Sequence, residues 1–252
     1  MRKPLIAGNW KMNLLNSKVP AYFTALNEVI KAVDRQKVDT LLAVPAPFLA
    51  TARESAQAAG VWIATQTIHE KHEGAFTGEI SIPMLKDLGI NWTLIGHSER
   101  RQYFNETDAT VAAKTKATLE AGIQAIVCVG ETQAEREKGQ MEGVLRRQME
   151  AVLAVCTKDS NFTIAYEPVW AIGTGLTATD AQAEEAHAFI RSIVREKLGS
   201  LADRLRILYG GSVKSSNIQG LLAQPNVDGA LIGGASLDPQ EFGKTVSLAA
   251  SR

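Results

Sequence analysis

The sequence predicts an α/β fold, a single (β/α)8 barrel with eight parallel strands and an outer ring of helices. Three observations support this prediction. Short apolar runs recur eight times, segments with helical spacing lie between them, and the first and last runs begin near residues 5 and 227 of 252. About 32 residues are thus available for each strand and its helix, which is enough for one βαβ unit. An open doubly wound sheet is an alternative that this alternation leaves open.

The expected strands are apolar on successive residues, which suits burial on both faces of a parallel sheet. In chain order they cover residues 5–7, 40–44, 62–65, 92–95, 124–129, 162–166, 205–209 and 227–232. Right-handed crossovers through helices would join each strand to the next.

The segments between the strands carry the spacing and the end residues of helices. One face of the first helix is formed by Leu26, Val29, Ile30 and Val33, and one face of a later helix by Leu145, Met149, Val152 and Leu153. Reciprocal caps are expected for the pairs Thr132 and Glu135, Thr179 and Gln182, and Asp238 and Glu241, with Pro239 as the first residue of the last helix. Helices are expected to stop at Gly60, Gly89, Gly122 and Gly199.

Composition restricts the class of protein. The chain has 27 Lys plus Arg against 27 Asp plus Glu and 45% hydrophobic residues. This balance argues against a nucleic-acid or membrane partner and is typical of a globular chain, here expected to be one domain over residues 1–252. No apolar run approaches the roughly 18 residues of a membrane helix. Cys128 and Cys156 match no metal or redox spacing, so we expect free thiols in a cytoplasmic protein.

Polar residues follow three of the expected strands. Asn9 and Lys11 follow the first, His97 and Glu99 the fourth, and Glu167 the sixth. Functional groups gather at the carboxyl ends of the strands in either parallel architecture, and a closed barrel would bring these distant segments together.

Each of these residues has a structural interpretation beside a catalytic one. Glu167 is either a partner in a structural ion pair or a general base, which the glycine-bearing loop from Pro168 to Ala178 would cover and shield from water. His97 is either a structural histidine or a neutral hydrogen-bond donor, held neutral by a helix N-terminus. Lys11 is either a solvated charge or a cation that favours an anionic ligand and a developing oxyanion.

Glycine pairs end the seventh and eighth expected strands, at Gly210-Gly211 and at Gly233-Gly234. In a barrel, backbone N–H groups at these two strand ends often hold phosphate.

Other motifs are weaker. Residues 173–178 fit the pattern G-x-G-x-x-G/A, with Glu196 beyond, but the tight turn directly after a strand is missing. Gly243-Lys244-Thr245 resembles the end of a P-loop but lacks its first glycine. His69 and His72 lie in a polar loop without metal-site spacing, so no metal is expected.

Five motifs together resemble the triosephosphate isomerase family over residues 4 to about 246. They are Asn-Trp-Lys at 9–11, Gly-His-Ser-Glu-Arg-Arg at 96–101, Tyr-Glu-Pro-Val-Trp-Ala-Ile-Gly-Thr-Gly at 166–175, Tyr-Gly-Gly-Ser at 209–212 and Gly-Gly at 233–234. The resemblance implies a TIM barrel enzyme of glycolysis and gluconeogenesis. It would interconvert dihydroxyacetone phosphate and D-glyceraldehyde 3-phosphate with neither a cofactor nor a metal.

The resemblance also implies a role for each site residue. Glu167 would move a proton between two substrate carbons, neutral His97 would polarise the carbonyl, and Lys11, with Asn9 beside it, would stabilise the enediolate. The residues that would bind the substrate phosphate are Gly173, Ser212, Gly233 and Gly234.

Family members are usually homodimers, and the resemblance implies one here through the long loop from Gln66 to Glu79. The sequence departs from the family in the lid, where Leu176 replaces a common Lys and Asp180 replaces Pro or Glu. Two other functions were weighed. A nicotinamide-dependent oxidoreductase would rest on the displaced glycine pattern alone, and a non-catalytic sugar-phosphate binding barrel would leave an intact base unexplained.

Overall fold

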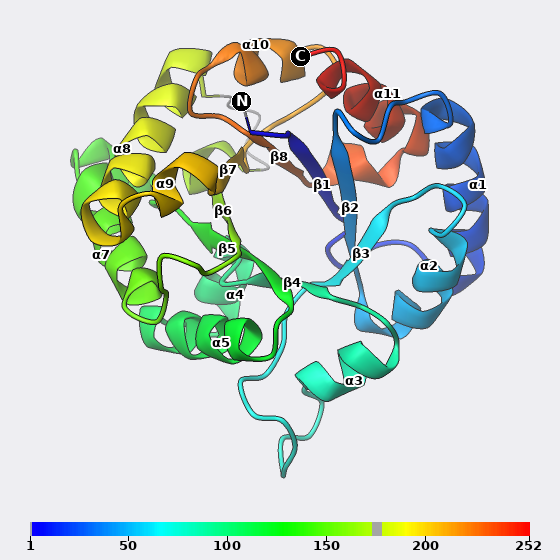
Figure 1. Ribbon diagram of the computed structural model, residues 1–252, viewed down its shortest axis with the longest axis horizontal. Coiled ribbons are helices and arrows are strands. Elements are labelled where there is room, and N and C mark those ends of the chain that lie inside the picture. The colour runs from blue at the N-terminus through cyan, green and yellow to red at the C-terminus, as the bar shows by residue number, and fades with distance from the viewer. Residues whose placement is uncertain (1, 173–177) are drawn as a thin grey trace.

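Eight parallel strands close into a barrel in the computed structural model, which describes residues 2–172 and 178–252. The strands follow one another around the barrel in chain order, and helices form a ring outside them (Figure 1). They are β1 (Leu5–Asn9), β2 (Asp39–Val44), β3 (Trp62–Thr65), β4 (Trp92–Ile95), β5 (Gln124–Val129), β6 (Thr163–Tyr166), β7 (Arg206–Tyr209) and β8 (Gly229–Ile232). The predicted (β/α)8 barrel is confirmed, and the open sheet is excluded because β1 pairs with β8.

The described helices fill every connection between strands. The α-helices are α1 (Val19–Ile30), α2 (Leu49–Ser55), α3 (Ile82–Asp87), α4 (Ser98–Tyr103), α5 (Asp108–Glu120), α6 (Gln133–Glu137), α7 (Met141–Leu153), α8 (Asp180–Leu198), α9 (Leu201–Arg204), α10 (Ile218–Ala223) and α11 (Pro239–Ala249). Short 3-10 helices are η1 (Asn16–Lys18), η2 (Ala46–Phe48), η3 (Val169–Ala171) and η4 (Gly234–Leu237). None of these helices has both the length and the apolar character needed to cross a membrane.

Alternate residues of each strand face opposite sides of the barrel wall, as strand geometry requires. One set fills the barrel interior, and the other packs against the helices. The interior set is Leu5, Ala7, Leu41, Ala43, Ala64, Trp92, Leu94, Ile126, Cys128, Ala165, Leu208 and Leu231. Burial on both sides explains why the strands are apolar on successive residues.

The barrel closes where β8 meets β1. A Cβ at Gly229 would lie 2.0 Å from the carbonyl oxygen of Leu5, and the φ angle of Gly229 is +147°. Only glycine allows both this approach and this backbone conformation. The eighth strand therefore starts at Gly229 rather than at the predicted Val227.

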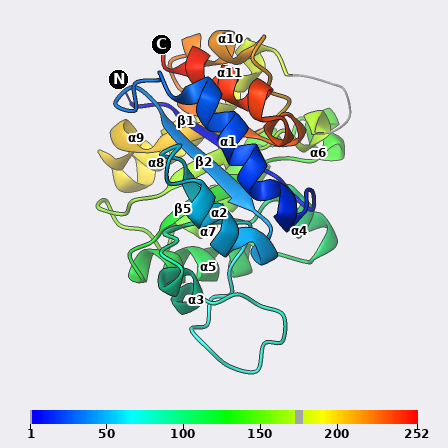
Figure 2. The same cartoon turned by 90° about the vertical axis from the view of Figure 1, so that its right-hand side faces the viewer.

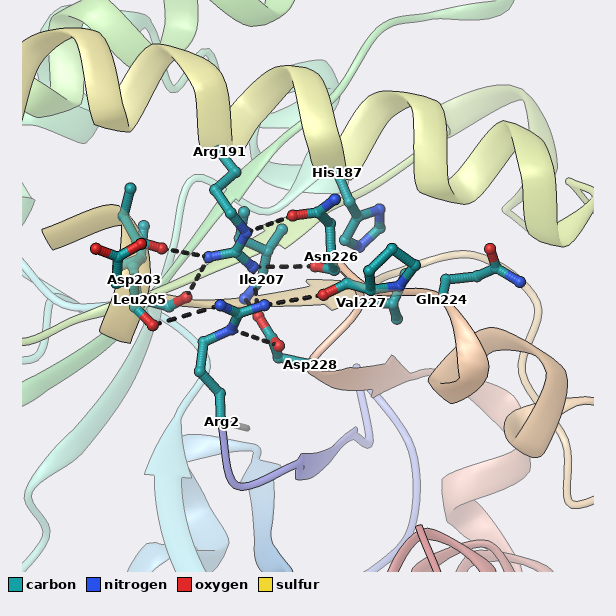
Figure 3. A network of polar contacts seen from close by, with 12 residues as sticks. Arg2, His187, Arg191, Asp203, Leu205, Ile207, Gln224, Asn226, Val227 and Asp228 are labelled. Atoms are coloured by element: carbon teal, nitrogen blue, oxygen red, sulfur yellow. Dashed lines mark hydrogen bonds and ion pairs between the residues drawn. The ribbon is translucent and has the colours of Figure 1, made fainter. Parts of the chain in front are cut away.

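A polar network fixes the amino-terminal end of the barrel (Figure 3). The buried carboxylate of Asp228 accepts hydrogen bonds from Arg2 Nε at 2.7 Å, from Arg191 NH2 at 2.6 Å and from the backbone N–H of Ile207 at 3.0 Å. These donors come from the segment before β1, from α8 and from β7. Because the buried charge is paired and fully hydrogen-bonded, it links three distant segments without leaving an orphan group.

Two of the three predicted reciprocal caps are confirmed, at Thr132 and at Thr179. The third, at Asp238, is wrong. Asp238 caps α11 through its own carboxylate, but Glu241 turns away and accepts from the backbone N–H of Ser215 at 2.6 Å. The side chain of Glu241 therefore links α11 to the segment after β7.

The predicted helix faces are largely confirmed. Leu26 and Ile30 are fully buried in α1, Val29 is half-buried, and Val33 lies beyond the end of the helix. All four residues predicted for the later helix are buried in α7. The four glycines expected at helix ends have positive φ angles, as left-handed turns after helices require.

The loop of residues 66–79 projects from the barrel between β3 and α3 (Figures 1 and 2). Gln66 anchors its start, because its side-chain amide donates to the carbonyl oxygen of Lys11 at 2.8 Å. Farther along, the rings of His69 and Phe76 lie 4.1 Å apart.

Candidate active site

A cleft of about 260 Å³ opens at the carboxyl ends of the strands. Asn9, Lys11, His97 and Glu167 all line it, although they come from three distant segments. The structure thus brings together four of the five strand-end side chains singled out in the sequence, and the fifth, Glu99, pairs with Lys11. Across the cleft lie three of the four residues expected to bind phosphate, Ser212, Gly233 and Gly234. The fourth, Gly173, lies outside the described residues.

Glu167 follows β6 directly and is 2% exposed. Its Oε1 lies 3.0 Å from Nε2 of His97, and its Oε2 accepts from the backbone N–H of Ser98 at 2.8 Å. Burial acts to raise the pKa of Glu167, but the imidazole, this N–H group and Lys11 lower it by more, so the net shift is downward. The carboxyl group is therefore ionised near neutral pH, which is the form that accepts a proton.

The backbone of Glu167 is held against the end of β5. Its N–H group donates to the carbonyl oxygen of Val129 at 2.8 Å. A Cβ at Gly130 would lie 1.8 Å from the carbonyl oxygen of Glu167. Only a residue without a side chain fits at position 130, so this glycine determines how closely Glu167 approaches its neighbour strand.

His97 is the N-cap residue of α4. Its Nδ1 accepts from the backbone N–H of Glu99 at 3.2 Å, so the proton of the neutral ring lies on Nε2, the nitrogen that faces Glu167. Burial lowers the pKa of His97, but the carboxylate of Glu167 raises it by more. The helix N-terminus expected from the sequence is present. Its positive dipole end disfavours a charged ring, whereas the carboxylate of Glu167 favours one, and the net shift of the His97 pKa is upward.

Lys11 lies two residues after the end of β1 in a left-handed conformation, with φ of +52°. Its Nζ pairs with Oε1 of Glu99 at 2.7 Å. A Cβ at Gly233 would lie 3.4 Å from Cε of Lys11, so the lysine reaches across the cleft toward η4. Left-handed backbone is costly for a residue with a side chain, and such strain tends to occur at functional sites.

Asn9 is the last residue of β1, two residues beyond the end of the predicted strand, because it pairs with Ala43 of β2. Its Oδ1 accepts from the backbone N–H of Lys11 at 3.0 Å and from Nε2 of Gln66 at 3.2 Å. The amide group of Asn9 therefore supports the unusual backbone of Lys11. A role for Gln66 in positioning Lys11 was not predicted from the sequence.

Ser212, Gly233 and Gly234 line the cleft together with Lys11. Within the described part of the chain, no hydrogen bond uses the backbone N–H of Ser212, Gly233 or Gly234. Gly233 precedes η4 and Gly234 begins it. Unpaired N–H groups beside an ammonium group form a favourable environment for an anion.

The sequence analysis also missed Glu131, which supports the segment after Glu167. Its carboxylate is fully buried and accepts from the hydroxyl of Tyr166 at 3.0 Å and from Nε1 of Trp170 at 2.9 Å. Burial raises the pKa of Glu131. Glu131 lies two residues after β5. The strand-end criterion that identified Glu167 could therefore also have identified Glu131.

The weaker motifs do not form sites in the described structure. Gly243, Lys244 and Thr245 lie inside α11, and Glu196 pairs with Arg146 on the surface. Among the described residues, no three His, Cys, Asp or Glu side chains are arranged to hold a metal ion. Residues 173–177, which include Leu176 and most of the dinucleotide pattern, lie outside the described residues. Asp180 begins α8.

Comparisons with known proteins agree with this geometry. The family model described as triosephosphate isomerase matches residues 4–249. A triosephosphate isomerase of Paracidovorax citrulli is 47% identical over 252 residues, which cover 99% of each chain. The triosephosphate isomerase of Trichlorobacter lovleyi is 50% identical over 96% of this chain and 97% of its own. That of Solibacter usitatus is 46% identical over 98% of this chain and 100% of its own.

Proposed function

The chain belongs to the triosephosphate isomerase family, and we propose from its site geometry how it interconverts dihydroxyacetone phosphate and D-glyceraldehyde 3-phosphate. The observation that carries the proposal is the convergence of an ionised carboxylate, an imidazole and an ammonium group in one cleft. The reaction moves a proton between adjacent carbons. It therefore needs a base at the carbons and donors at the oxygens.

Glu167 is proposed as the base. Its carboxylate is deprotonated and held between His97 and the N–H group of Ser98, and substrate entering the cleft would compete for the imidazole. Glu167 would take the proton from one substrate carbon, leaving an enediolate, and return it to the neighbouring carbon.

His97 and Lys11 are proposed to act on the substrate oxygens. With Nδ1 occupied by the N–H group of Glu99, His97 presents its Nε2 proton as a hydrogen-bond donor. The donor would stabilise the oxygen on which negative charge develops and would pass a proton between the two oxygens. The Lys11 ammonium group, turned toward η4, would favour both the enediolate and the phosphate.

The substrate phosphate is proposed to bind the N–H groups of Ser212, Gly233 and Gly234, which have no hydrogen-bond partner among the described residues. Gly173 is proposed as a fourth donor, as part of a lid that covers the site. The segment before the lid is anchored because Trp170 and Tyr166 both donate to buried Glu131. A covered site would exclude water and strengthen the interactions of the enediolate with its donors.

The family assignment favours the isomerase over the two other functions weighed from the sequence. A dinucleotide site would need the glycine pattern directly after a strand, whereas β6 ends at Tyr166 and η3 intervenes before residue 173. A non-catalytic binding barrel would have no use for a buried, ionised carboxylate beside an imidazole.

The substitution Glu167→Gln tests the assignment of the base. The amide has nearly the same shape but cannot accept the proton, so kcat should fall by at least about 10³-fold while the affinity for inorganic phosphate changes little. Steady-state isomerisation kinetics and phosphate titration measure both quantities. Glu28→Gln serves as a matched control, because it makes the same change at an exposed carboxylate that pairs with Lys31 and does not line the cleft, so turnover should stay parental. Near-parental turnover of the Glu167 variant would contradict the proposal.

We also propose a homodimer, a cytoplasmic location and one domain over residues 1–252. The loop of residues 66–79 carries Phe76, whose side chain is 43% exposed, and Met12 beside the active-site lysine is 95% exposed. Exposed apolar side chains of this size are typical of an interface. Free thiols at Cys128 and Cys156 suit a reducing compartment.

A further inference from the structure

A second cleft lies at the other end of the barrel, at the amino-terminal ends of β3 and β4. Its volume is about 310 Å³, and it is bordered by the end of α2 and the turns that precede the two strands. The turns containing Gly60 and Gly89 form part of its wall. This cleft shares no lining residue with the active site or with the loop of residues 66–79.

An aromatic stack forms one side of this cleft. Trp62 and Trp92 are stacked, with ring centroids 5.3 Å apart and an interplanar angle of 19°. The guanidinium carbon of Arg206 lies 6.0 Å from the ring centroid of Trp92, and Arg206 pairs with Asp39 at 2.6 Å. Trp92 is 7% exposed, whereas Trp62 is 41% exposed. Trp92, the inner ring of the stack, is therefore covered, whereas the ring of Trp62 is accessible at the surface.

One cationic group, Arg53, lines the same cleft as Trp62, and a second, Arg35, lies behind the wall, with its Nε 3.9 Å from the position that a Cβ would take at Gly60. Arg53 is the one charged side chain among the described residues that line the cleft, and its Nε donates to the carbonyl oxygen of Gly89 at 3.2 Å. No salt bridge within the described part of the chain involves Arg53 or Arg35. Arg35 NH2 donates to the carbonyl oxygen of Ala59 at 2.6 Å, and its NH1 is buried with no hydrogen-bond partner.

The remaining polar groups are neutral. Gln57 and Asn91 line the cleft, and both are exposed. A guanidinium group that is held in place by a backbone carbonyl, but lacks a counter-charge, retains donors for a planar acid group. The electrostatics of the cleft thus favour an anion, and its wall favours a flat ring.

We propose that this cleft binds a small planar aromatic anion, with its ring against the exposed indole of Trp62 and its acid group at Arg53. Aromatic pairs prefer stacked or edge-on contacts and gain about 0.5–1.5 kcal/mol beyond area burial. The volume lies at the lower end of the roughly 300–1,000 Å³ range of small-molecule sites, which suits one or two fused rings. Triose phosphates have no ring, so the occupant differs from the substrate of the proposed function.

The probe for this site is 2-naphthoate, titrated into the full-length protein. Binding is followed by the indole N–H resonances of the four tryptophans in ¹⁵N NMR spectra. The resonances of Trp62 and Trp92 should shift with saturation, while that of Trp10, buried between β1 and α1, should not. Two comparison compounds separate the contributions, because cyclohexanecarboxylate has the charge without the aromatic ring and 2-naphthalenemethanol has the ring without the charge.

Variants assign the contributions to residues. Trp62→Val and Arg53→Gln should each weaken 2-naphthoate binding by roughly tenfold and leave isomerase turnover unchanged. Arg204→Gln is the matched control, because exposed Arg204 also donates to a backbone carbonyl but does not line the cleft. Saturation by glycerol phosphate at the active site should not displace the probe. The proposal is overturned if Trp62 does not respond to millimolar 2-naphthoate, if cyclohexanecarboxylate binds equally well, or if neither variant changes the affinity.

Discussion

Side chains in the active site pair with one another. Glu167 pairs with His97, and Lys11 pairs with Glu99, so each reactive group has a partner of opposite charge or a hydrogen-bond donor. This arrangement keeps buried charges compensated before the substrate arrives. Substrate binding must exchange these internal contacts for contacts with the phosphate and the carbonyl oxygen.

The charge of Lys11 is expected to contribute to both binding and catalysis. Lys11→Met should reduce kcat/KM at least about a hundredfold and should also weaken the affinity for inorganic phosphate, because the cation acts before and during the reaction. Steady-state kinetics and phosphate titration provide the two readouts. Lys31→Met removes an exposed lysine that pairs with Glu28 on the surface and should change neither. Unchanged phosphate affinity in the Lys11 variant would disprove this dual role.

His187 makes stability depend on pH. It is fully buried in α8, its Nδ1 lies 2.6 Å from the carbonyl oxygen of Ala183, and burial lowers its pKa to about 4. An unfolded histidine titrates near 6.5, so as pH falls below that value the unfolded chain gains a proton that the folded chain does not. The contribution is constant above about pH 6.5 and is lost between about pH 6.5 and pH 4.

Denaturant unfolding at fixed protein concentration tests this expectation. The His187 contribution should lower the free energy of unfolding by roughly 2 kcal/mol between pH 7 and pH 5. His187→Gln should have a smaller slope of stability against pH, whatever its absolute stability. Identical slopes for the two proteins would show that His187 is not the group responsible.

At the scale of elements, strand ends determine where the catalytic groups lie. The end of β5 approaches the first residue after β6 so closely that Gly130 has no room for a side chain. Glu167, the proposed base, is therefore positioned by a backbone contact between neighbouring strands rather than by its own loop. Strand ends are more rigid than loops, which suits a group that must be held within a fraction of an ångström.

Gly130→Ala should therefore destabilise the protein and impair its activity together. The added methyl group would overlap the carbonyl oxygen of Glu167, so the strand ends must separate, at an expected cost of more than about 3 kcal/mol. Gly143→Ala is the matched control, since Gly143 is exposed within α7 with nothing near its Cβ position. It should gain about 0.5–1 kcal/mol from helix propensity. Thermal melts and isomerase assays distinguish the two variants. Parental stability and activity of the Gly130→Ala protein would refute this account of the strand ends.

Elements were predictable from the sequence where the local pattern decides them. The strands at 62–65, 92–95 and 124–129 have the predicted bounds, because apolar and β-branched residues predominate in each. Contacts between distant residues decide the rest. Asn9 belongs to β1 because it pairs with Ala43, and Glu241 leaves its expected cap because Ser215 lies nearby.

The same distinction applies to the site. Asn9, Lys11, His97 and Glu167 could be singled out because strand-end positions can be read from the chain. Gln66 supports residues 55 to 57 positions away, so no local pattern indicates its role. Roles of this kind follow only from the closed barrel.

For the whole molecule, the two ends of the barrel have different tasks. The amino-terminal end is fixed by Arg2, Arg191 and Asp228, which join the chain start to α8 and β8 (Figure 3). The carboxyl-terminal end of the barrel holds the active-site cleft and the polar residues at the strand ends. Separation of stabilising contacts from reactive groups allows the active-site end to hold strained residues such as Lys11 without loss of the fold.

The projecting loop of residues 66–79 is expected to pair two copies of the chain. Sedimentation equilibrium at micromolar concentration should show a dimer, and Phe76→Asp should weaken association at least about tenfold by placing a charge in an apolar contact. Leu88→Asp alters a partly exposed apolar residue outside this loop and should leave the dimer intact. A parental chain that sediments only as a monomer would refute the homodimer.

The central claim is that Glu167 moves a proton between adjacent carbons of a triose phosphate. The most direct measurement is isomerisation of D-glyceraldehyde 3-phosphate in D₂O followed by NMR, with Glu167→Gln protein as the blank. We predict formation of dihydroxyacetone phosphate with deuterium at the carbon that receives the proton, because a carboxylate base exchanges with solvent. Folded protein that binds the substrate without turning it over would contradict the claim.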